Sequence, residues 1–500
     1  SRFVARMIES HSILGLTFAA LIYIVSLTGA FTLFVEEIAV WENADAPTAE
    51  RVSAQAYQAA LENAYGERGE GNDIHSLLTF GPTEFAPALM VRLNETLPSG
   101  EERHTDGIAD PRTGALLGEA DTPLSHLIEQ LHVALHLPAP WGRYLVGLLG
   151  VCMFSLVISG ILAHPTIFKD AFKLRFDRNR RIAWTDLHNR LSVWGLPFHL
   201  VLTFTGGFLG LAGLIIGAVA LLAYDGDRER ALVSLQSPQP IQGAQLAGLP
   251  PVGQMVRQIR EVREDGHPIE LIIVRDPHNS GGITAINMLD NSILDSRYSL
   301  IFRNSGAFVE TYGGERAPAG LRALAMLQPL HFGTFGGYPI KFLYFFMALA
   351  LTWVTSSGMK IWFSRREQQG RAVPRMRAAW HGMTAGLTLG LAGATLASAA
   401  GVGELVLPIC LAAWIAAIAA FLLAPFRWET FYPVALIASA MLLLGAAGIA
   451  TVTSGATTGL PAVVSIAVLV IALMLAGFAL RGWRRGDSFA HWVAAGTQPG

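Results

Sequence analysis

The sequence is poor in charged residues and in cysteine. Only 15% of its 500 residues are charged, whereas 52% are hydrophobic. This balance excludes an ordinary soluble protein and favours a polytopic protein embedded in a lipid bilayer. The two cysteines, Cys152 and Cys410, each lie in a long apolar run, which excludes a disulfide framework and a CxxC-type metal or redox site. Lysine and arginine form no basic stretches interleaved with aromatics, so we expect no nucleic-acid partner.

Several catalytic motifs are also absent. The chain has no HExxH motif, no P-loop and no GxSxG motif, which leaves metalloprotease, nucleotide hydrolase and serine hydrolase functions without support. Gly206, Gly207 and Gly210 lie inside an apolar stretch, where small residues favour close helix packing rather than dinucleotide binding. No flavin or nicotinamide site is visible, so electrons for a redox reaction would have to come from a partner or a quinol.

Eight apolar stretches are long enough, at about 20 residues, to cross the hydrocarbon core of a bilayer as helices. They cover residues 12–35, 142–163, 195–222, 342–363, 380–400, 405–425, 431–452 and 460–480. The first is too long for a signal peptide and no cleavage site follows it, so we expect an uncleaved span.

Basic residues gather after the second and fourth stretches and in the tail. They are Lys169, Lys173, Arg175, Arg178, Arg180, Arg181, Arg365, Arg366, Arg371, Arg375, Arg377, Arg481, Arg484 and Arg485. By the positive-inside rule, these segments and both termini are cytoplasmic.

Two long polar segments are therefore expected on the opposite side of the membrane. Each has a helical pattern (53–65 and 252–262) before short β-rich runs at 88–93, 271–274 and 298–302, with turn signals at 110–114 and 280–282. This predicts two small α+β domains. The expected divisions are the first span (1–38), the first outer domain (39–137), spans two and three with a basic loop (138–224), the second outer domain (225–330), span four with a basic loop (331–376), and a C-terminal region of four membrane helices and a tail (377–500).

The chain contains an internal repeat. A threonine follows His11 by seventeen positions in the first span, and another follows His188 by seventeen positions in the third. His132 precedes the second span and His331 precedes the fourth, and both spans end near a Ser-Gly pair. We infer a duplicated unit of span, outer domain and span, followed by four additional helices. Such a duplication places equivalent residues around a pseudo-twofold axis.

This axis pairs the repeated histidines. His11 and His188 should face each other at the cytoplasmic end, and His132 and His331 at the outer end. Two facing imidazoles are what a six-coordinate haem requires, because its iron needs one axial nitrogen on each face. The chain has no CxxCH attachment motif, so the haem would be non-covalent. We therefore predict about two b-type haems, with these four histidines as axial ligands.

Three further histidines stay open as haem ligands. His199 follows His188 by eleven positions, which on one continuous helix is nearly the same face about 16 Å deeper. His164 ends the second span, and neither has a histidine at the equivalent position of the other repeat. His136 lies one turn from His132 and competes with it as the outer ligand. The glutamates at positions 36 and 37 are expected only to mark the membrane interface.

Four short motifs indicate a family. They are Asp186-Leu187-His188-Asn189, Leu196-Pro197-Phe198-His199, the entry to span two at Trp141-Gly142-Arg143-Tyr144-Leu145-Val146-Gly147, and Leu330-His331-Phe332-Gly333 with Phe335-Gly336-Gly337. Over about residues 5–366 the chain resembles the PepSY-associated transmembrane proteins of bacteria. The resemblance implies PepSY-like outer domains, a Gram-negative inner membrane and a link to iron uptake, since some members look like haem-containing reductases of ferric siderophores. The matching motif histidines are His11, His132, His188 and His331.

The leading hypothesis is a dihaem b-type electron conduit. It would carry electrons from a cytoplasmic flavoprotein or the quinone pool to a ferric siderophore or another ferric chelate held by the periplasmic domains. Reduction would release the iron, because hard oxygen ligands favour Fe(III) over Fe(II). One alternative is a non-redox, membrane-anchored PepSY module that binds peptides or envelope proteins. Another is a haem or siderophore transporter with a pathway through the C-terminal helices.

Overall fold

The computed structural model describes residues 2–67, 72–164, 166, 180–228, 230–231, 238–262, 268–289, 294, 297–313, 319–425, 427–453 and 458–484. The chain divides into two compact units, each described by itself. The helical unit comprises Ser1–Glu42, Thr122–Leu211 and Tyr338–Gly500, and the sheet unit comprises Asn43–Asp121 and Ala212–Gly337. Of the basic residues used to assign orientation, those from Lys169 to Arg178 and Arg485 lie outside the described residues.

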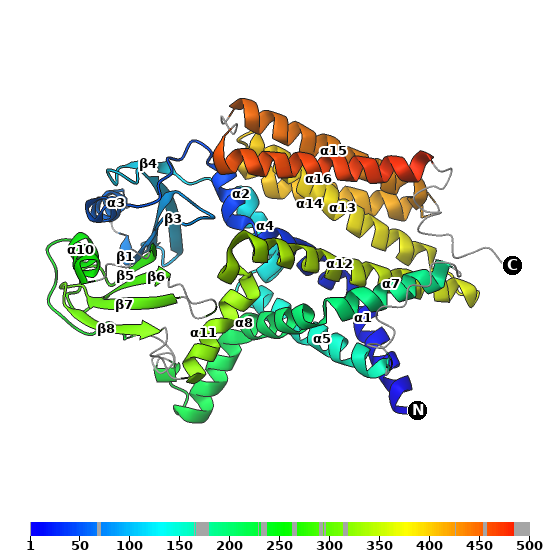
Figure 1. Ribbon diagram of the computed structural model, residues 1–500, viewed down its shortest axis with the longest axis horizontal. Helices are drawn as coiled ribbons and strands as arrows, with labels where there is room; N and C mark the ends of the chain where they lie inside the picture. Colours follow the sequence, from blue (N-terminus) through cyan, green and yellow to red (C-terminus); the bar gives the residue numbers. More distant parts are fainter. Residues whose placement is uncertain are drawn as a thin grey trace. The chain divides into compact units, whose positions relative to one another are not determined.

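Eight helices of the described chain are long and apolar enough to cross a membrane, as the sequence predicted. They are α1 (Arg2–Thr32), α5 (Trp141–Ala163), α8 (Leu196–Ala223), α12 (Gly337–Gln368), α13 (Pro374–Ala399), α14 (Val406–Leu423), α15 (Trp428–Thr453) and α16 (Gly459–Arg484) (Figure 1). The shorter helices α2 (Val35–Glu42), α4 (Pro123–Ala134) and α7 (Arg180–Trp194) and the 3₁₀ turn η3 (Gly403–Leu405) also belong to the helical unit.

The segment that carries His188 and His199 is not one continuous helix, so that expectation was wrong. Helix α7 ends at Trp194 and α8 begins at Leu196, with Gly195 between them. Pro197 follows at the second position of α8, where its missing N–H cannot continue the hydrogen bonds of the preceding helix. The two histidines therefore lie on different helices, although hydrogen bonds from Gly195 to Leu191 and from His199 to Gly195 are still made at the junction.

Helices α5 and α8 pack closely through glycine, as the sequence predicted. A Cβ atom on Gly147 would come within 2.8 Å of the backbone of Gly210, and one on Gly150 within 2.6 Å of the backbone of Gly207. Only glycine permits this backbone approach. The glycine-rich run therefore belongs to a helix interface.

The four C-terminal helices are built around α13. In its most apolar stretch 67% of the residues are buried, against 17% in both α14 and α16. One side of α13 packs on α1, where Trp380 meets Tyr23 edge to face at 5.6 Å, and the same apolar cluster includes Phe363 of α12. Helix α13 thus joins the additional helices to both repeats.

The sheet unit contains one antiparallel sheet of eight strands. The strands are β1 (Asp73–Phe80), β2 (Leu89–Thr96), β3 (Glu102–Ala109), β4 (Leu116–Glu119), β5 (Ile269–Arg275), β6 (Ile283–Leu289), β7 (Arg297–Arg303) and β8 (Phe308–Gly313). Their order is β4-β3-β2-β1-β5-β6-β7-β8. Each polar segment supplies four consecutive strands, and β1 pairs with β5 with Leu78 opposite Ile273. The two α+β halves predicted from the sequence thus share one continuous sheet.

One hydrophobic core serves both halves of this sheet. Helices α3 (Ala54–Gly66) and α10 (Val252–Val262) lie side by side on the sheet (Figure 1). Tyr57 of α3 and Met255 of α10 are buried in the same cluster as Leu77 of β1 and Ile272 of β5. Helix α11 (Ala319–Phe332) and the 3₁₀ turn η2 (Thr334–Gly336) also belong to the sheet unit.

Candidate functional site

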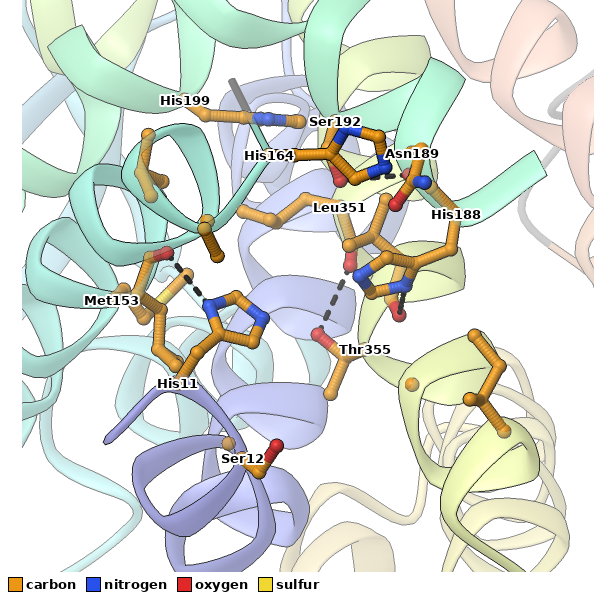
Figure 2. A pocket seen from close by; sticks show the side chains of 18 of the residues that line it. His11, Ser12, Met153, His164, His188, Asn189, Ser192, His199, Leu351 and Thr355 are labelled. Carbon is orange, nitrogen blue, oxygen red and sulfur yellow. Dashed lines mark hydrogen bonds between the residues drawn. The ribbon is translucent and has the colours of Figure 1, made fainter. Parts of the chain in front are cut away.

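A cavity of about 420 Å³ lies in the helical unit, lined by α1, α5, α7, α8 and α12. Its volume falls within the range of about 300–1,000 Å³ usual for cofactor sites. Four of the candidate histidines line it: His11, His164, His188 and His199 (Figure 2). Among the residues that the structure describes, no group of three or more His, Cys, Asp or Glu side chains could hold a bare metal ion. A six-coordinate haem requires only two side chains.

His11 reaches the cavity from α1 and is anchored to α5. Its Nδ1 donates a hydrogen bond to the backbone carbonyl of Leu156 at 3.0 Å and lies 3.2 Å from Oγ of Ser159. Because the carbonyl can only accept, the proton is on Nδ1 and Nε2 carries the lone pair. That Nε2 has no hydrogen-bond partner within the described part of the chain.

His188 repeats this arrangement between α7 and α12. Its Nδ1 donates to the carbonyl of Val354 at 3.1 Å and lies 3.0 Å from Oγ of Ser357. Val354 and Ser357 are the repeat equivalents of the two anchors of His11. In Figure 2 the two imidazoles reach into the cavity from different helices. The structure therefore brings together the inner pair that the repeat predicted.

Most residues that line the cavity occupy equivalent positions in the two repeats. His188 follows His11 by 177 positions, and the same offset relates the α1 residues of the wall to those of α7 and α8. An offset of 198 relates the walls supplied by α5 and α12, such as Gly160 and Gly358. A Cβ atom at Gly160 would lie 3.3 Å from Cε1 of His11, and one at Gly358 would lie 3.5 Å from Cε1 of His188. Glycine at both positions thus leaves room for the imidazole rings.

His199 is one of the positions at which the two halves of the cavity differ. The side chain is only 2% exposed, and its Nε2 has no hydrogen-bond partner in the described structure. The equivalent residue of the other repeat is Ile22, which also lines the cavity. Gly195 makes room for the ring, because a Cβ there would lie 2.6 Å from Cε1 of His199.

The other two open candidates are placed differently. His164 caps the C-terminal end of α5, is exposed and lines the cavity, and its repeat equivalent is Trp362. His136 follows the end of α4 in a left-handed conformation, with φ of 55°, and does not line this cavity. Its backbone N–H donates to the carbonyl of Gln130, which closes the helix end.

The outer pair is divided between the two units. His132 belongs to α4 in the helical unit, and its Nδ1 donates to the carbonyl of Val25 at 2.9 Å. Burial lowers the pKa of His132, which favours the neutral imidazole that binds metals. His331 lies near the end of α11 in the sheet unit. Because each unit is described by itself, the pairing of His132 with His331 stays a prediction.

Glu37 does more than mark an interface, so that expectation was wrong. Its carboxylate is 3% exposed and binds Nζ of Lys341, itself 2% exposed, at 2.6 Å. The ammonium also lies over the ring of Phe34 at 5.6 Å. Buried charges in membrane proteins are usually paired and functional. The two residues are 304 positions apart, and no repeat relation links them, so only the fold reveals the pair.

Comparison with known proteins agrees with this architecture. The pattern of the PepSY-associated TM region matches residues 8–365, and the chain belongs to that family. The match includes both repeats and ends before α13. The uncharacterized protein PA4219 of Pseudomonas aeruginosa is 30% identical over 356 residues, which are 66% of this chain and 85% of that protein. The family predicted from the sequence motifs is confirmed, whereas the ligand roles of the histidines stay predictions.

Proposed function

We propose that the protein is a b-type haem electron conduit of the ferric-siderophore reductase type. The observation that carries the proposal is the inner histidine pair. His11 and His188 come from equivalent positions of two repeats, line one cavity, and keep Nε2 available because Nδ1 is bound to a backbone carbonyl. Histidines that ligate metals almost always donate their other ring N–H in this way, which fixes the tautomer and the ring orientation.

The rest of the cavity suits a large apolar cofactor. Its walls are mostly aliphatic, with Leu16, Leu156, Val354 and Met359 among the lining residues, and such walls exclude water from the metal. Arg365 also lines the cavity and would provide a permanent cation for the carboxylates of a haem. A bound haem would supply one-electron transfer, while the protein would supply axial nitrogens, orientation and a dry surrounding.

The proposed direction of electron flow follows from the charge distribution. Arg365, Arg371 and Arg377 follow or flank the C-terminal end of α12, so this end is assigned to the cytoplasm and the sheet unit to the periplasm of a Gram-negative inner membrane. A quinol or a cytoplasmic flavoprotein would donate electrons to the haem at His11 and His188. A second haem, between His132 and His331, would pass them to a ferric siderophore or similar chelate outside, where Fe(II) is released.

A second candidate function has one observation in its favour. Strand β8 is the last strand of the sheet in the described part of the chain, and its residues Phe308 and Val309 are 54% and 37% exposed. An exposed edge with apolar side chains can accept an added peptide strand. A non-redox PepSY module that binds a peptide or an envelope protein would use this edge and would need no haem.

An absorption spectrum of the purified protein, with and without dithionite, separates these functions. We expect reduced b-type bands and about two haems per chain. The variants His11→Ala and His188→Ala should each lose the same haem, because each removes one axial nitrogen from one iron. His381→Ala is the matched control, since His381 is buried on α13 outside the cavity and its Nδ1 donates to the backbone carbonyl of Arg377 in the same helix. Colourless protein from cells supplied with haem precursor would contradict the conduit and favour the binding module.

A further inference from the structure

His199 has a feature that haem ligation by His11 and His188 does not explain. It lines the same cavity and is almost fully buried, yet its Nε2 makes no hydrogen bond of good geometry among the described residues, and the backbone acceptor near the ring is Ser192. A buried polar atom without a well-formed hydrogen bond is unfavourable, so its presence in a native protein calls for an explanation.

The other repeat shows that the fold does not require a histidine here. The equivalent position holds Ile22, which is 3% exposed and lines the same cavity. An aliphatic side chain therefore packs well at this position of the repeat. The imidazole at position 199 adds a titratable group to only one half of an otherwise symmetric site.

Reduction of a haem changes its charge, and a titratable group nearby can compensate for that change. A ferric b-type haem core carries one net positive charge and the ferrous core carries none, and the low dielectric of a membrane interior makes this change costly. A nearby neutral imidazole can offset it by binding one proton.

The other charged or titratable groups around the cavity are less suited to this role. His11 and His188 would have Nε2 on the iron, and Arg365 is permanently charged. His164 is exposed at the end of α5, and Tyr344 of α12 meets α8 through Phe198 at 4.9 Å. His199 is thus the buried imidazole at the wall of this cavity that is neither an expected axial ligand nor permanently charged.

We propose that His199 is a redox-linked proton acceptor that binds one proton at Nε2 when one electron enters the haem of this cavity. This rests on the proposed function. The electron comes from the quinol or flavoprotein donor and the proton from water; the iron goes from ferric to ferrous and the imidazole becomes an imidazolium. When the electron leaves for the next acceptor, the proton is released. His199 is a tuning residue and not an axial ligand.

Redox titration of the purified haem protein at several pH values between about 6 and 8 tests this inference. The haem concerned is the one that His11→Ala removes. If one proton is taken up per electron, the midpoint potential of this haem in the wild-type protein should fall by as much as about 59 mV for each unit rise in pH. His199→Ile, which inserts the residue of the other repeat, should keep the haem bands and flatten this dependence. His381→Ala is the control, because it removes a buried histidine that lies outside the cavity, and it should keep the wild-type slope.

Further variants keep the test decisive. If His199→Ile loses its haem, His199→Gln retains a polar side chain that cannot titrate and should show the same flat dependence. Adding Ile22→His to His199→Ile places an imidazole at the symmetric position and should restore the slope. A wild-type potential independent of pH, or an unchanged slope in His199→Ile and His199→Gln, would overturn the inference while leaving the haem conduit intact. Absence of haem from the wild-type protein would instead refute the proposed function.

Discussion

At the scale of single residues, the candidate ligands share one device. His11, His132 and His188 each donate Nδ1–H to a backbone carbonyl of a neighbouring helix. A carbonyl inside a helix usually accepts only the N–H four residues later, so it has a second lone pair available. Each bond therefore orients a ring without breaking a helix. Small residues opposite the rings provide the space that this orientation needs.

Gly29 offers the sharpest test of this arrangement. A Cβ atom there would lie 2.7 Å from Cε1 and 2.8 Å from Nδ1 of His132, closer than nonbonded atoms allow. Gly29→Ala should therefore displace the ring and break the bond from Nδ1 to Val25, with a loss of about 1–3 kcal/mol in the free energy of unfolding. In the haem-loaded protein it should also alter the outer haem signal while leaving the signal of the His11 and His188 haem unchanged.

Gly15→Ala is the control on the same helix. A Cβ atom at Gly15 would meet only Cδ2 of Leu156, at an ordinary distance of 3.7 Å. Thermal unfolding and low-temperature electron paramagnetic resonance of both variants provide the comparison. Equal effects of the two substitutions would show that helix composition, rather than contact with His132, determines the outcome.

The buried pair of Glu37 and Lys341 is a second feature at this scale. Breaking a buried ion pair by removing one partner typically costs 3–5 kcal/mol, because the other charge is left uncompensated. The pair links the start of the helical unit to the fourth span. It therefore constrains how the two repeats meet, although the pair itself has no symmetric copy.

At the scale of helices, a side chain from one element completes the end of another. Thr122 precedes α4 but makes no capping hydrogen bond with its side chain. The carboxylate of Glu42, at the end of α2, accepts hydrogen bonds from the backbone N–H groups of Leu124 and Ser125 at 2.7 and 3.1 Å. It also accepts from the hydroxyls of Ser125 and Ser398. Glu42 thus caps α4, the helix that carries His132, and ties it to α13.

Substitution Glu42→Gln tests this cap. An amide offers one oxygen instead of two, and its NH₂ group would face donors of α4 that already need an acceptor. Burial raises the pKa of Glu42. Both of its oxygens nevertheless accept hydrogen bonds, and this arrangement favours the ionised carboxylate over the protonated acid. We expect a loss of about 1–3 kcal/mol and a lower midpoint of thermal unfolding. Glu36→Gln, at an exposed neighbour on α2, should leave the midpoint unchanged, and equal midpoints for the two variants would argue against the cap.

The sequence predicted the eight membrane spans but not the boundary between α7 and α8. Span length depends on the local sum of hydrophobicity, so all eight spans were found, although α1 begins at Arg2 rather than at the expected residue 12. The separation of α7 from α8 was missed, because apolar residues continue through Gly195 and Pro197. Proline is also common in the first turn of a helix. The local sequence therefore did not show whether one helix is interrupted at Pro197 or a new helix begins there.

At the scale of the whole molecule, the duplication carried most of the prediction. It identified the inner histidine pair, because symmetry relates residues that are far apart in the chain. It did not reveal that β1 and β5 join the two halves of the sheet, since strand pairing over such a distance leaves no local pattern. It also missed the pair of Glu37 and Lys341, and the His199 nitrogen without a partner, because neither follows the repeat.

The orientation in the membrane can be tested without reference to haem. Ser99 lies in an exposed turn between β2 and β3, and exposed Gln368 ends α12. Three spans, α5, α8 and α12, separate these positions, so they must lie on opposite sides of the membrane. In the proposed orientation Gln368 is cytoplasmic, because arginines lie beside it. In a background with Cys152→Ala and Cys410→Ala, Ser99→Cys should therefore react with an impermeant maleimide in spheroplasts. Gln368→Cys should react only after the membrane is permeabilised, and the background alone should not react.

Reversed labelling would place the sheet unit in the cytoplasm, where it could not present a periplasmic ferric chelate, and the proposed direction of electron flow would be wrong.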